Sequence, residues 1–387
     1  MSNTKALDPG MVVRGNERVL RARLADAKFF YDLDRKRPLE ERVEDLKGVV
    51  FQEKLGTSYD KVMRNMEVAE SLSAMVAPEV AESIKRATLL SKADLVTEVV
   101  GEFPTLQGVM GGIYARESGD TEEVALAVRE HYLPLGGGGE LPESVTGAVV
   151  GIADRIETLA GYFGIGSVPS GTADPYGLRR RALGTIRIVL KFRFRISLRD
   201  LMDVALKGLS GVIDADTDGI GDQLREFIIL RFKNLLIAEG SPYDVVEAVL
   251  AVQNDDLTDA VDRVRAIADV RDSENFEPLM IACKRIINIV GDATDRNVNA
   301  SSFVEDQERD LFEAFGKQNE KVTEALSGKD YQIAMEALAE LKGPVDAFFD
   351  HVMVMDKDPE LQRNRLALLL NLADMFGKIA DLTNISE

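Results

Sequence analysis

The sequence has little of the chemistry that most metal centres and nucleophilic sites require. Its 387 residues include one cysteine, Cys283, and two histidines. A lone cysteine forms no internal disulfide, as is typical of a reducing cytoplasm. Zinc clusters and Cys-His or Ser-His dyads need several such groups in convergent positions, so we expect none. Any chemistry must rest mainly on carboxylates, lysine and arginine.

Long hydrophobic runs are also missing. The most apolar stretches, such as residues 366–370, are far shorter than the roughly 20 residues that cross a bilayer. The first residues, MSNTKALDPG, lack the charged and apolar blocks of a signal peptide. The sequence therefore predicts a cytoplasmic protein without a membrane role.

Positive charge is scarce over the whole chain. Lys and Arg total 47 against 66 Asp and Glu, which gives a formal net charge of −19. A surface with this charge repels phosphate at long range, so DNA and anionic membranes are not expected partners. A nucleic acid would bind this chain only at a local basic patch.

The hydrophobic pattern predicts an all-α protein of two or three domains. Leu20, Leu24, Ala27 and Tyr31 recur at helical spacing, which indicates an amphipathic helix. Asp358-Pro359 has the signature of a helix start, an N-cap followed by proline at the first helical position.

The clearest predicted helix begins near Ser144 and carries an unusual second face. Beside its apolar stripe, Gly147, Gly151 and Gly161 recur at nearly the same spacing, together with Asp154. Glycine destabilises a helix interior by up to about 1 kcal/mol, so three on one face predict close backbone packing. Asp154 would then face a crevice. The alternative is that Asp154 faces solvent and the glycines have no role.

A basic run interrupts the acidic sequence after Pro175. Between Pro175 and Asp200 the sequence contains many lysines and arginines and no acidic residue. They are Arg179, Arg180, Arg181, Arg187, Lys191, Arg193, Arg195 and Arg199. The run either binds phosphate or pairs with acidic surface elsewhere in the protein.

Two loop motifs lack the residues that their usual ligands need. The four glycines at 136–139 are followed by Glu140 and Leu141, instead of the Gly-Lys-Ser/Thr of a phosphate loop. Asp214, Asp216 and Asp218 match the start of an EF-hand, but Arg225 takes the position of the bidentate glutamate. We therefore expect neither a phosphate loop nor specific calcium binding there.

Several long stretches together resemble the beta subunit of bacterial heterotetrameric glycyl-tRNA synthetase. They lie at Gly15 to Asp34, Phe51 to Arg64, Lys92 to Ala115, Arg129 to Pro134, Ile152 to Gly184 and Phe348 to Leu369. The family's subunit is longer, and its N-terminal domains have no counterpart here, so a truncated chain is expected.

The resemblance implies a division of labour between two subunits. The alpha subunit would carry the class II active site with its ATP and magnesium, and the beta subunit would bind glycine tRNA. The implied architecture is an extended segment at 1–12, a helical domain similar to HD phosphohydrolases at 13–199, a helical linker at 200–275 and an anticodon-binding helical bundle at 276–387. No catalytic residue and no cofactor are expected in this chain.

The HD-like domain is expected to retain only remnants of a metal site. A working site needs a His-Asp pair and further ligands around a divalent metal. The corresponding stretch here reads Lys92-Ala93-Asp94, and His131 and Asp154 would be the remaining ligands. A lysine ammonium at an imidazole's place would repel a cation, so no bound metal is predicted.

The resemblance also implies that some basic and polar residues of this chain bind tRNA. Arg179, Arg180, Arg181, Arg187 and Lys191 are expected to contact backbone phosphates. In the C-terminal bundle, Lys284, Arg285, Arg363, Asn364 and Arg365 are candidates for anticodon bases. The alternative is that these bundle residues are solvated or structural.

Three functional hypotheses remain at this point. The first is a non-catalytic chain that positions glycine tRNA for the alpha subunit. The second is an HD-type, metal-dependent phosphohydrolase that uses Asp94 and Asp154. The third is a helical scaffold whose basic run docks an acidic protein.

Overall fold

The computed structural model describes residues 8–136, 138–213, 217–271 and 276–385. These residues divide by their contacts into Met1–Ile228 and Ile229–Glu387. Helix α10 (Thr217–Ala238) contains the point of division. The all-α prediction is confirmed, since the described elements are helices apart from two short strands and isolated bridges. Within these residues no helix is both long and apolar enough to span a bilayer.

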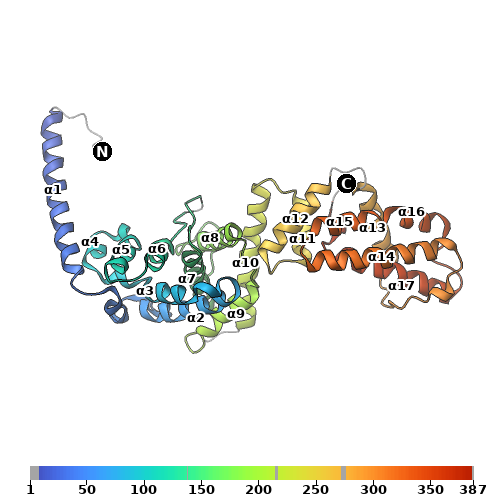
Figure 1. Ribbon diagram of the computed structural model, residues 1–387, viewed down its shortest axis with the longest axis horizontal. Helices are drawn as coiled ribbons and strands as arrows, with labels where there is room; N and C mark the ends of the chain where they lie inside the picture. Colours follow the sequence, from blue (N-terminus) through green and yellow to red (C-terminus); the bar gives the residue numbers. More distant parts are fainter. Residues whose placement is uncertain (1–7, 137, 214–216, 272–275, 386–387) are drawn as a thin grey trace. The chain divides into compact units, whose positions relative to one another are not determined.

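The first unit is a helical domain built around α7, the helix predicted from Ser144 (Figure 1). Residues 146–163 of α7 are all buried, and α2, α3, α6, α8 and α9 pack against it. The helices of this unit are α1 (Pro9–Asp34), α2 (Ser58–Val76), α3 (Ala81–Leu90), α4 (Glu98–Glu102), α5 (Val109–Glu117), α6 (Glu122–Glu130), α7 (Val145–Gly164), α8 (Leu178–Phe192) and α9 (Leu198–Gly208). A helix buried all round must satisfy its polar groups internally.

A small hairpin leads into α2. Strands β1 (Val50–Gln52) and β2 (Gly56–Thr57) pair antiparallel, with Val50 opposite Thr57. Thr57 then caps α2 in a reciprocal capping box, because its Oγ1 accepts from the Asp60 amide and the Asp60 carboxylate accepts from the Thr57 amide. This cap fixes where α2 begins and thereby its register along α7.

The three glycines of α7 lie where other parts of the chain approach closely. A Cβ at Gly147 would lie 2.9 Å from the Cβ of Glu130, and one at Gly151 would lie 3.1 Å from the carbonyl oxygen of His131. At Gly161 it would lie 2.9 Å from Leu55 Cδ1. The predicted close packing is therefore confirmed, and the interpretation of glycines without a role is wrong.

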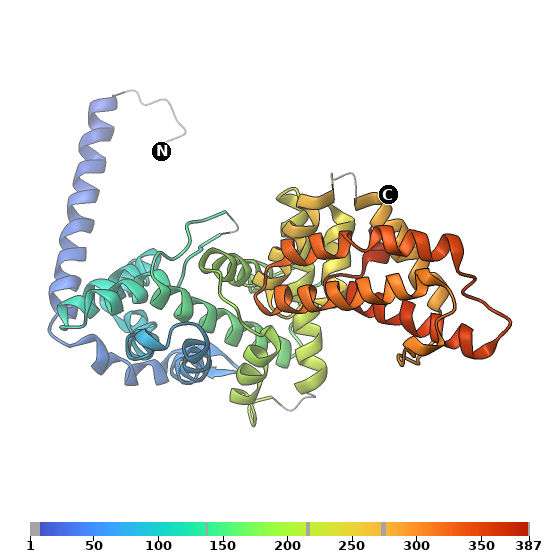
Figure 2. The same cartoon turned by 45° about the vertical axis from the view of Figure 1, so that its right-hand side comes forward.

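The second unit is a bundle in which α14 packs on α15 and α16, and α13 packs on α17. Its helices are α11 (Tyr243–Val252), α12 (Leu257–Arg271), α13 (Phe276–Val290), α14 (Asp306–Ser327), α15 (Tyr331–Ala339), α16 (Lys342–His351) and α17 (Pro359–Gly377) (Figure 2). Asp358 caps α17 by accepting from the Glu360 amide, with Pro359 at the first helical position. The helix start predicted there is confirmed.

The expected extended segment at 1–12 is wrong for its described part. Helix α1 begins at Pro9, and the Asp8 side chain accepts from the Met11 amide, 3.1 Å away. Residues 1–7 lie outside the described residues. The predicted linker 200–275 is helical where it is described, from α9 to α12. Its limits at 199 and 276 stay predictions, since the contact division falls at Ile228.

Gly147→Ala should lower the free energy of unfolding by about 1–3 kcal/mol, the usual range for overpacking. Glu130 cannot retreat freely, because it accepts from the backbone amides of Glu143 and Ser144. Gly316→Ala in α14, where nothing lies within 4 Å of the added Cβ, is the control and should be neutral or stabilising by up to about 1 kcal/mol. Denaturant unfolding measures both, and equal destabilisation would contradict the packing argument.

Candidate functional site

Asp154 of α7 lies at the centre of a buried cluster of charges. Lys92 Nζ lies 3.1 Å and Lys61 Nζ 3.3 Å from its Oδ1, and Arg181 Nη1 lies 3.6 Å from its Oδ2. Burial alone would raise the pKa of Asp154, but these three cations outweigh it and hold the pKa well below its usual value. Asp154 exposes only 4% of its surface. The solvent-facing alternative is therefore wrong, while the crevice stays a prediction.

The cluster continues along α7 through Glu157. Its carboxylate pairs with Lys61 and, at 2.7 Å, with Arg64 Nε. Lys61 also donates to the Thr158 hydroxyl at 2.7 Å. These contacts join α2 to α7 by a network in which each buried charge has an opposite charge and further hydrogen bonds, which offsets the large desolvation penalty.

Lys92 joins the imidazole to this cluster. Its Nζ lies 2.9 Å from His131 Nε2, and His131 Nδ1 lies 2.7 Å from the Val128 carbonyl oxygen. Burial, helped by the Lys92 charge, lowers the pKa of His131 well below its usual value, so the ring is neutral. Burial lowers the pKa of Lys92 to about 8, and Asp154 opposes this shift. A neutral ring that donates a hydrogen bond from Nδ1 to the Val128 carbonyl accepts a hydrogen bond from the Lys92 ammonium at Nε2.

Asp94 has a separate structural role at the start of α5. Its Oδ2 accepts from the amides of Gly108 at 2.6 Å and Gly111 at 3.0 Å. Burial raises the pKa of Asp94 to about 6, although both hydrogen bonds oppose this shift. The carboxylate satisfies backbone donors at a helix terminus, as a capping side chain does.

These four remnants of an HD-like site do not fit a divalent metal. The Lys92 ammonium lies within hydrogen-bonding distance of both His131 and Asp154, so it has the place that a cation between those ligands would need. Asp94 is bound to backbone amides instead. Among the residues described, no group of three or more His, Cys, Asp or Glu suits a metal ion.

The part of the basic run from Arg179 to Lys191 lies on α8, and most of these cations have contacts within the chain. Arg179 donates to the carbonyls of Gly171 and Ala173. Arg187 and Lys191 donate to the backbone carbonyls of residues 139 and 142 in the glycine-rich loop. Gly137 of that loop lies outside the described residues.

Arg180 differs from its neighbours on α8. It is exposed, and none of the described residues forms an ion pair or hydrogen bond with its guanidinium. Arg181 extends in the opposite sense, toward buried Asp154, while about a third of its side chain stays exposed. Consecutive helical residues point about 100° apart, so this arginine cluster has one member anchored in the core and one available to a ligand.

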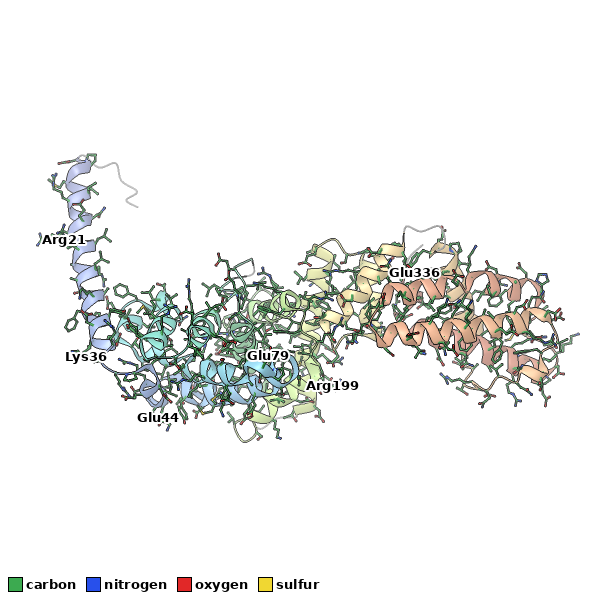
Figure 3. The ribbon with its side chains drawn as sticks, viewed as in Figure 1. Arg21, Lys36, Glu44, Glu79, Arg199 and Glu336 are labelled. Carbon is green, nitrogen blue, oxygen red and sulfur yellow. The ribbon has the colours of Figure 1, made fainter. Side chains whose placement is uncertain are left out.

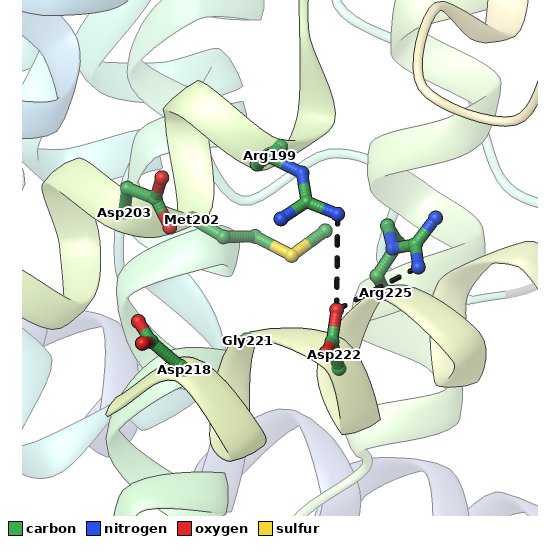
Figure 4. A pocket seen from close by; sticks show the side chains of 7 residues that line it. All are labelled: Arg199, Met202, Asp203, Asp218, Gly221, Asp222 and Arg225. Carbon is green, nitrogen blue, oxygen red and sulfur yellow. Dashed lines mark ion pairs between the residues drawn. The ribbon is translucent and has the colours of Figure 1, made fainter. Parts of the chain in front are cut away.

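The acidic loop that resembles an EF-hand falls partly outside the description. Asp214 and Asp216 are not among the described residues, and Asp218 borders a cavity of about 290 Å³ between α9 and α10 (Figure 4). In this cavity Asp222 lies between Arg225, at 3.6 Å, and Arg199, at 3.8 Å. Arg225, which takes the position of the bidentate glutamate, therefore pairs with a carboxylate.

The candidate residues of the second unit divide into buried and exposed groups. Arg365 is buried and donates to Glu308, Asp356 and the Met353 carbonyl. The buried Asn364 side chain exchanges two hydrogen bonds with the backbone of Asn299. Their polar atoms are occupied and cannot reach a base, so the expectation that they contact bases is corrected to a structural role.

The other three candidates are more accessible. The Arg363 side chain is 68% exposed and lies 3.7 Å from Asp295. Lys284 is half-buried, and Arg285 is exposed with its Cζ 4.0 Å from the Phe349 ring centroid. Surface ion pairs such as Arg363–Asp295 are weak, so the Arg363 side chain can exchange Asp295 for a ligand.

Comparison with known families shows to which family this chain belongs. The family model described as glycyl-tRNA synthetase beta subunit matches residues 1–251, which is more than half of the chain. The chain belongs to this family. A second model, the DALR anticodon binding domain, matches residues 279–387 of this beta-subunit chain, and thus covers most of the bundle α13 to α17.

Individual relatives agree with this assignment. The glycine–tRNA ligase beta subunits of Citrifermentans bemidjiense and Geobacter sp. are 46% and 45% identical over 386 residues. That of Syntrophus aciditrophicus is 42% identical over 385 residues. Each match covers the whole of this chain and 56% of the relative, so the chain spans about half the length of the curated relatives it matches.

The sequence argument for this beta-subunit chain missed Lys61, Arg64 and Glu157. Glu157 had a readable signal, because Asp154, Arg155 and Glu157 are the only charged residues in an otherwise apolar helix, and such residues need internal partners. No sequence signal marked Lys61 and Arg64, since cations in an amphipathic helix usually face solvent. Phe349 was missed because an aromatic residue at helical spacing is usually part of the core.

Arg365→Met should lower the free energy of unfolding of the second unit by about 3–5 kcal/mol, because it leaves Glu308 buried without its cation. Arg363→Met, two residues away and exposed, should change it by less than about 1 kcal/mol. Thermal and denaturant unfolding followed by circular dichroism measure both effects. Similar stability of the two variants would show that Arg365 is not the structural residue that its contacts indicate.

Proposed function

We propose that this chain binds glycine tRNA and positions it so that the acceptor end reaches the class II site of the alpha subunit. The main support is the position of Arg180 at the start of the basic helix α8. Its side chain is exposed and has no partner among the described residues. Family membership and the anticodon binding domain at 279–387 support it. ATP and magnesium would be bound by the alpha subunit, and the complex would act in the cytoplasm.

The two units would contribute different kinds of contact. On α8, guanidinium groups would bind backbone phosphates, which fixes orientation without reading sequence. In the bundle, side chains would contact unpaired anticodon bases, where RNA sequence is accessible. Two modest contacts on one chain strengthen each other, because the second forms within an existing complex. A net charge of −19 makes such local patches necessary, since the rest of the surface repels RNA.

Arg180→Glu should weaken binding of glycine tRNA about tenfold or more, roughly the value of one charge-assisted hydrogen bond. It should also reduce the dependence of log affinity on log salt by about one. Fluorescence titration of labelled tRNA at two salt concentrations measures both quantities.

Arg116→Glu is the matched control for this variant. Arg116 is exposed and paired with Glu122, and the substitution changes the net charge equally. Its effect on tRNA affinity should be small. Equal losses for both variants would show that only overall charge matters, and tRNA binding that does not depend on salt would overturn the proposed phosphate contact.

A second binding function is favoured by α1. Of its 26 residues only Asp34 is buried, and Val13, Leu20 and Leu24, each more than half exposed, share one face at spacings of seven and four residues. Figures 1 and 2 show its N-terminal half running beyond the other helices of its unit, and Figure 3 shows Arg21 extending away from it. An apolar face of this length on one helix is typical of a protein-docking surface. Since the relatives are subunits of an assembly, we propose the alpha subunit as its partner.

Leu24→Asp should weaken binding of the purified alpha subunit at least tenfold, because burying an unpaired carboxylate in an apolar interface is costly. Val50→Asp is the control, since Val50 is similarly exposed at 72% but lies on β1. Isothermal titration calorimetry measures both affinities. Unchanged affinity of Leu24→Asp would mean that another protein segment or a second copy covers α1.

A further inference from the structure

Arg285 differs from every other arginine of the anticodon-binding region. Among the described residues of 279–387, the other four are each ion-paired: Arg296 with Asp374, Arg309 with Asp306, Arg363 with Asp295, and Arg365 with Glu308 and Asp356. Arg285 has no carboxylate partner within this described region. On a chain with 66 acidic residues, a surface arginine usually pairs with a carboxylate. The absence of such a partner at Arg285 therefore needs another explanation.

The guanidinium of Arg285 instead lies on an aromatic ring. Its Cζ is 4.0 Å from the centroid of Phe349, across the contact between α13 and α16. Phe349 is half-buried and meets Phe348 edge to face, with centroids 5.7 Å apart and planes at 77°. Phe348 is fully buried, so one edge of Phe349 is held by the core while the ring supports Arg285 at the surface.

We propose that Arg285 and Phe349 form a platform on which an unpaired base of the tRNA anticodon loop stacks. A guanidinium is planar and weakly hydrated, and it stacks on rings while its N–H groups stay free to donate. Nucleobases stack on both aromatic rings and guanidinium planes in complexes with single-stranded RNA. A pair fixed in this way needs no reorganisation before the base arrives, which reduces the entropic loss on binding.

Other occupants fit this pair less well. A free phosphate or an acidic peptide would use the charge of Arg285 but not the aromatic face beneath it. An apolar protein segment would use the ring but leave the guanidinium without an acceptor. Only a base, with a π-face and polar edges, satisfies both groups, and RNA adds the negative backbone that attracts Arg285. The platform rests on the proposed tRNA-binding function and adds the place and mode of one base contact.

The test uses an anticodon stem-loop of glycine tRNA with 2-aminopurine at successive loop positions, because stacking quenches its fluorescence. The wild-type chain should bind the stem-loop and quench one position. Phe349→Leu keeps an apolar side chain but removes the π-face, and we expect roughly tenfold weaker binding with loss of the quench. Phe349→Trp should restore both. Arg285→Lys keeps the charge but loses the plane, and should behave like Phe349→Leu.

Tyr243→Leu is the control for loss of an exposed aromatic residue beside a cation. Tyr243 is 60% exposed and lies 4.8 Å from Lys233 Nζ, which already pairs with Glu247. It should leave affinity and quench unchanged. Circular dichroism melting checks that each variant folds, and Arg285→Lys at the surface tests the platform even where Phe349→Leu unfolds.

Whole glycine tRNA, titrated in parallel, distinguishes the two levels of the proposal. Suppose that whole tRNA and the stem-loop both bind in a salt-sensitive way, and that Phe349→Leu and Arg285→Lys change neither the affinity nor the quench. This result would overturn the platform and leave the proposed function standing. If the wild-type chain bound neither RNA at low salt, both would be overturned. Equal losses in Phe349→Leu and Phe349→Trp would also overturn the platform, because the contact would then not depend on a π-face.

Discussion

The burial of α7 is the constraint on which the first unit depends. Its residues 146–163 are all buried, yet Asp154, Arg155 and Glu157 carry charge. Arg155 is satisfied by carbonyls, including those of Gly151 and residues 131–133. The two carboxylates need cations from outside the helix, and Lys61, Lys92 and Arg181 supply them. Helices α2 and α8 and the segment between α3 and α4 are therefore held in place by ion pairs as well as by apolar packing.

This arrangement links the core to the surface that we propose for RNA. Arg181 belongs to both, because its guanidinium reaches Asp154 while part of its side chain stays exposed. The ion pair lies on the side of α8 that also buries Leu178 and Ala182, and Arg180 faces outward. Lys92 stabilises the same carboxylate from within and neighbours a neutral imidazole. At the place where the sequence predicted remnants of a metal site, a lysine therefore stabilises the buried carboxylate.

The sequence predicted elements better than partners. Periodicity located α7 and α17, and glycine spacing identified the close approaches around α7, because both signals are local along the chain. Asn364 and Arg365 looked accessible near a helix start, but Asn299 and Glu308, which bind them, lie 65 and 57 residues away. No local pattern encodes such pairs. The error at residues 9–12 was avoidable, since Asp8-Pro9 has the same signature as Asp358-Pro359.

On an acidic chain, the arginines most available to a ligand are those that form no ion pair with a carboxylate. Most described arginines in the anticodon-binding region are engaged by carboxylates, and RNA would have to break those pairs before binding. Arg180 and Arg285 need no such exchange, one because it is solvated and the other because its partner is a ring. A phosphate or base gains their full hydrogen-bonding capacity on arrival. If RNA binds as we propose, the net charge of −19 would sharpen specificity, because it would leave RNA few productive places to bind and repel it elsewhere.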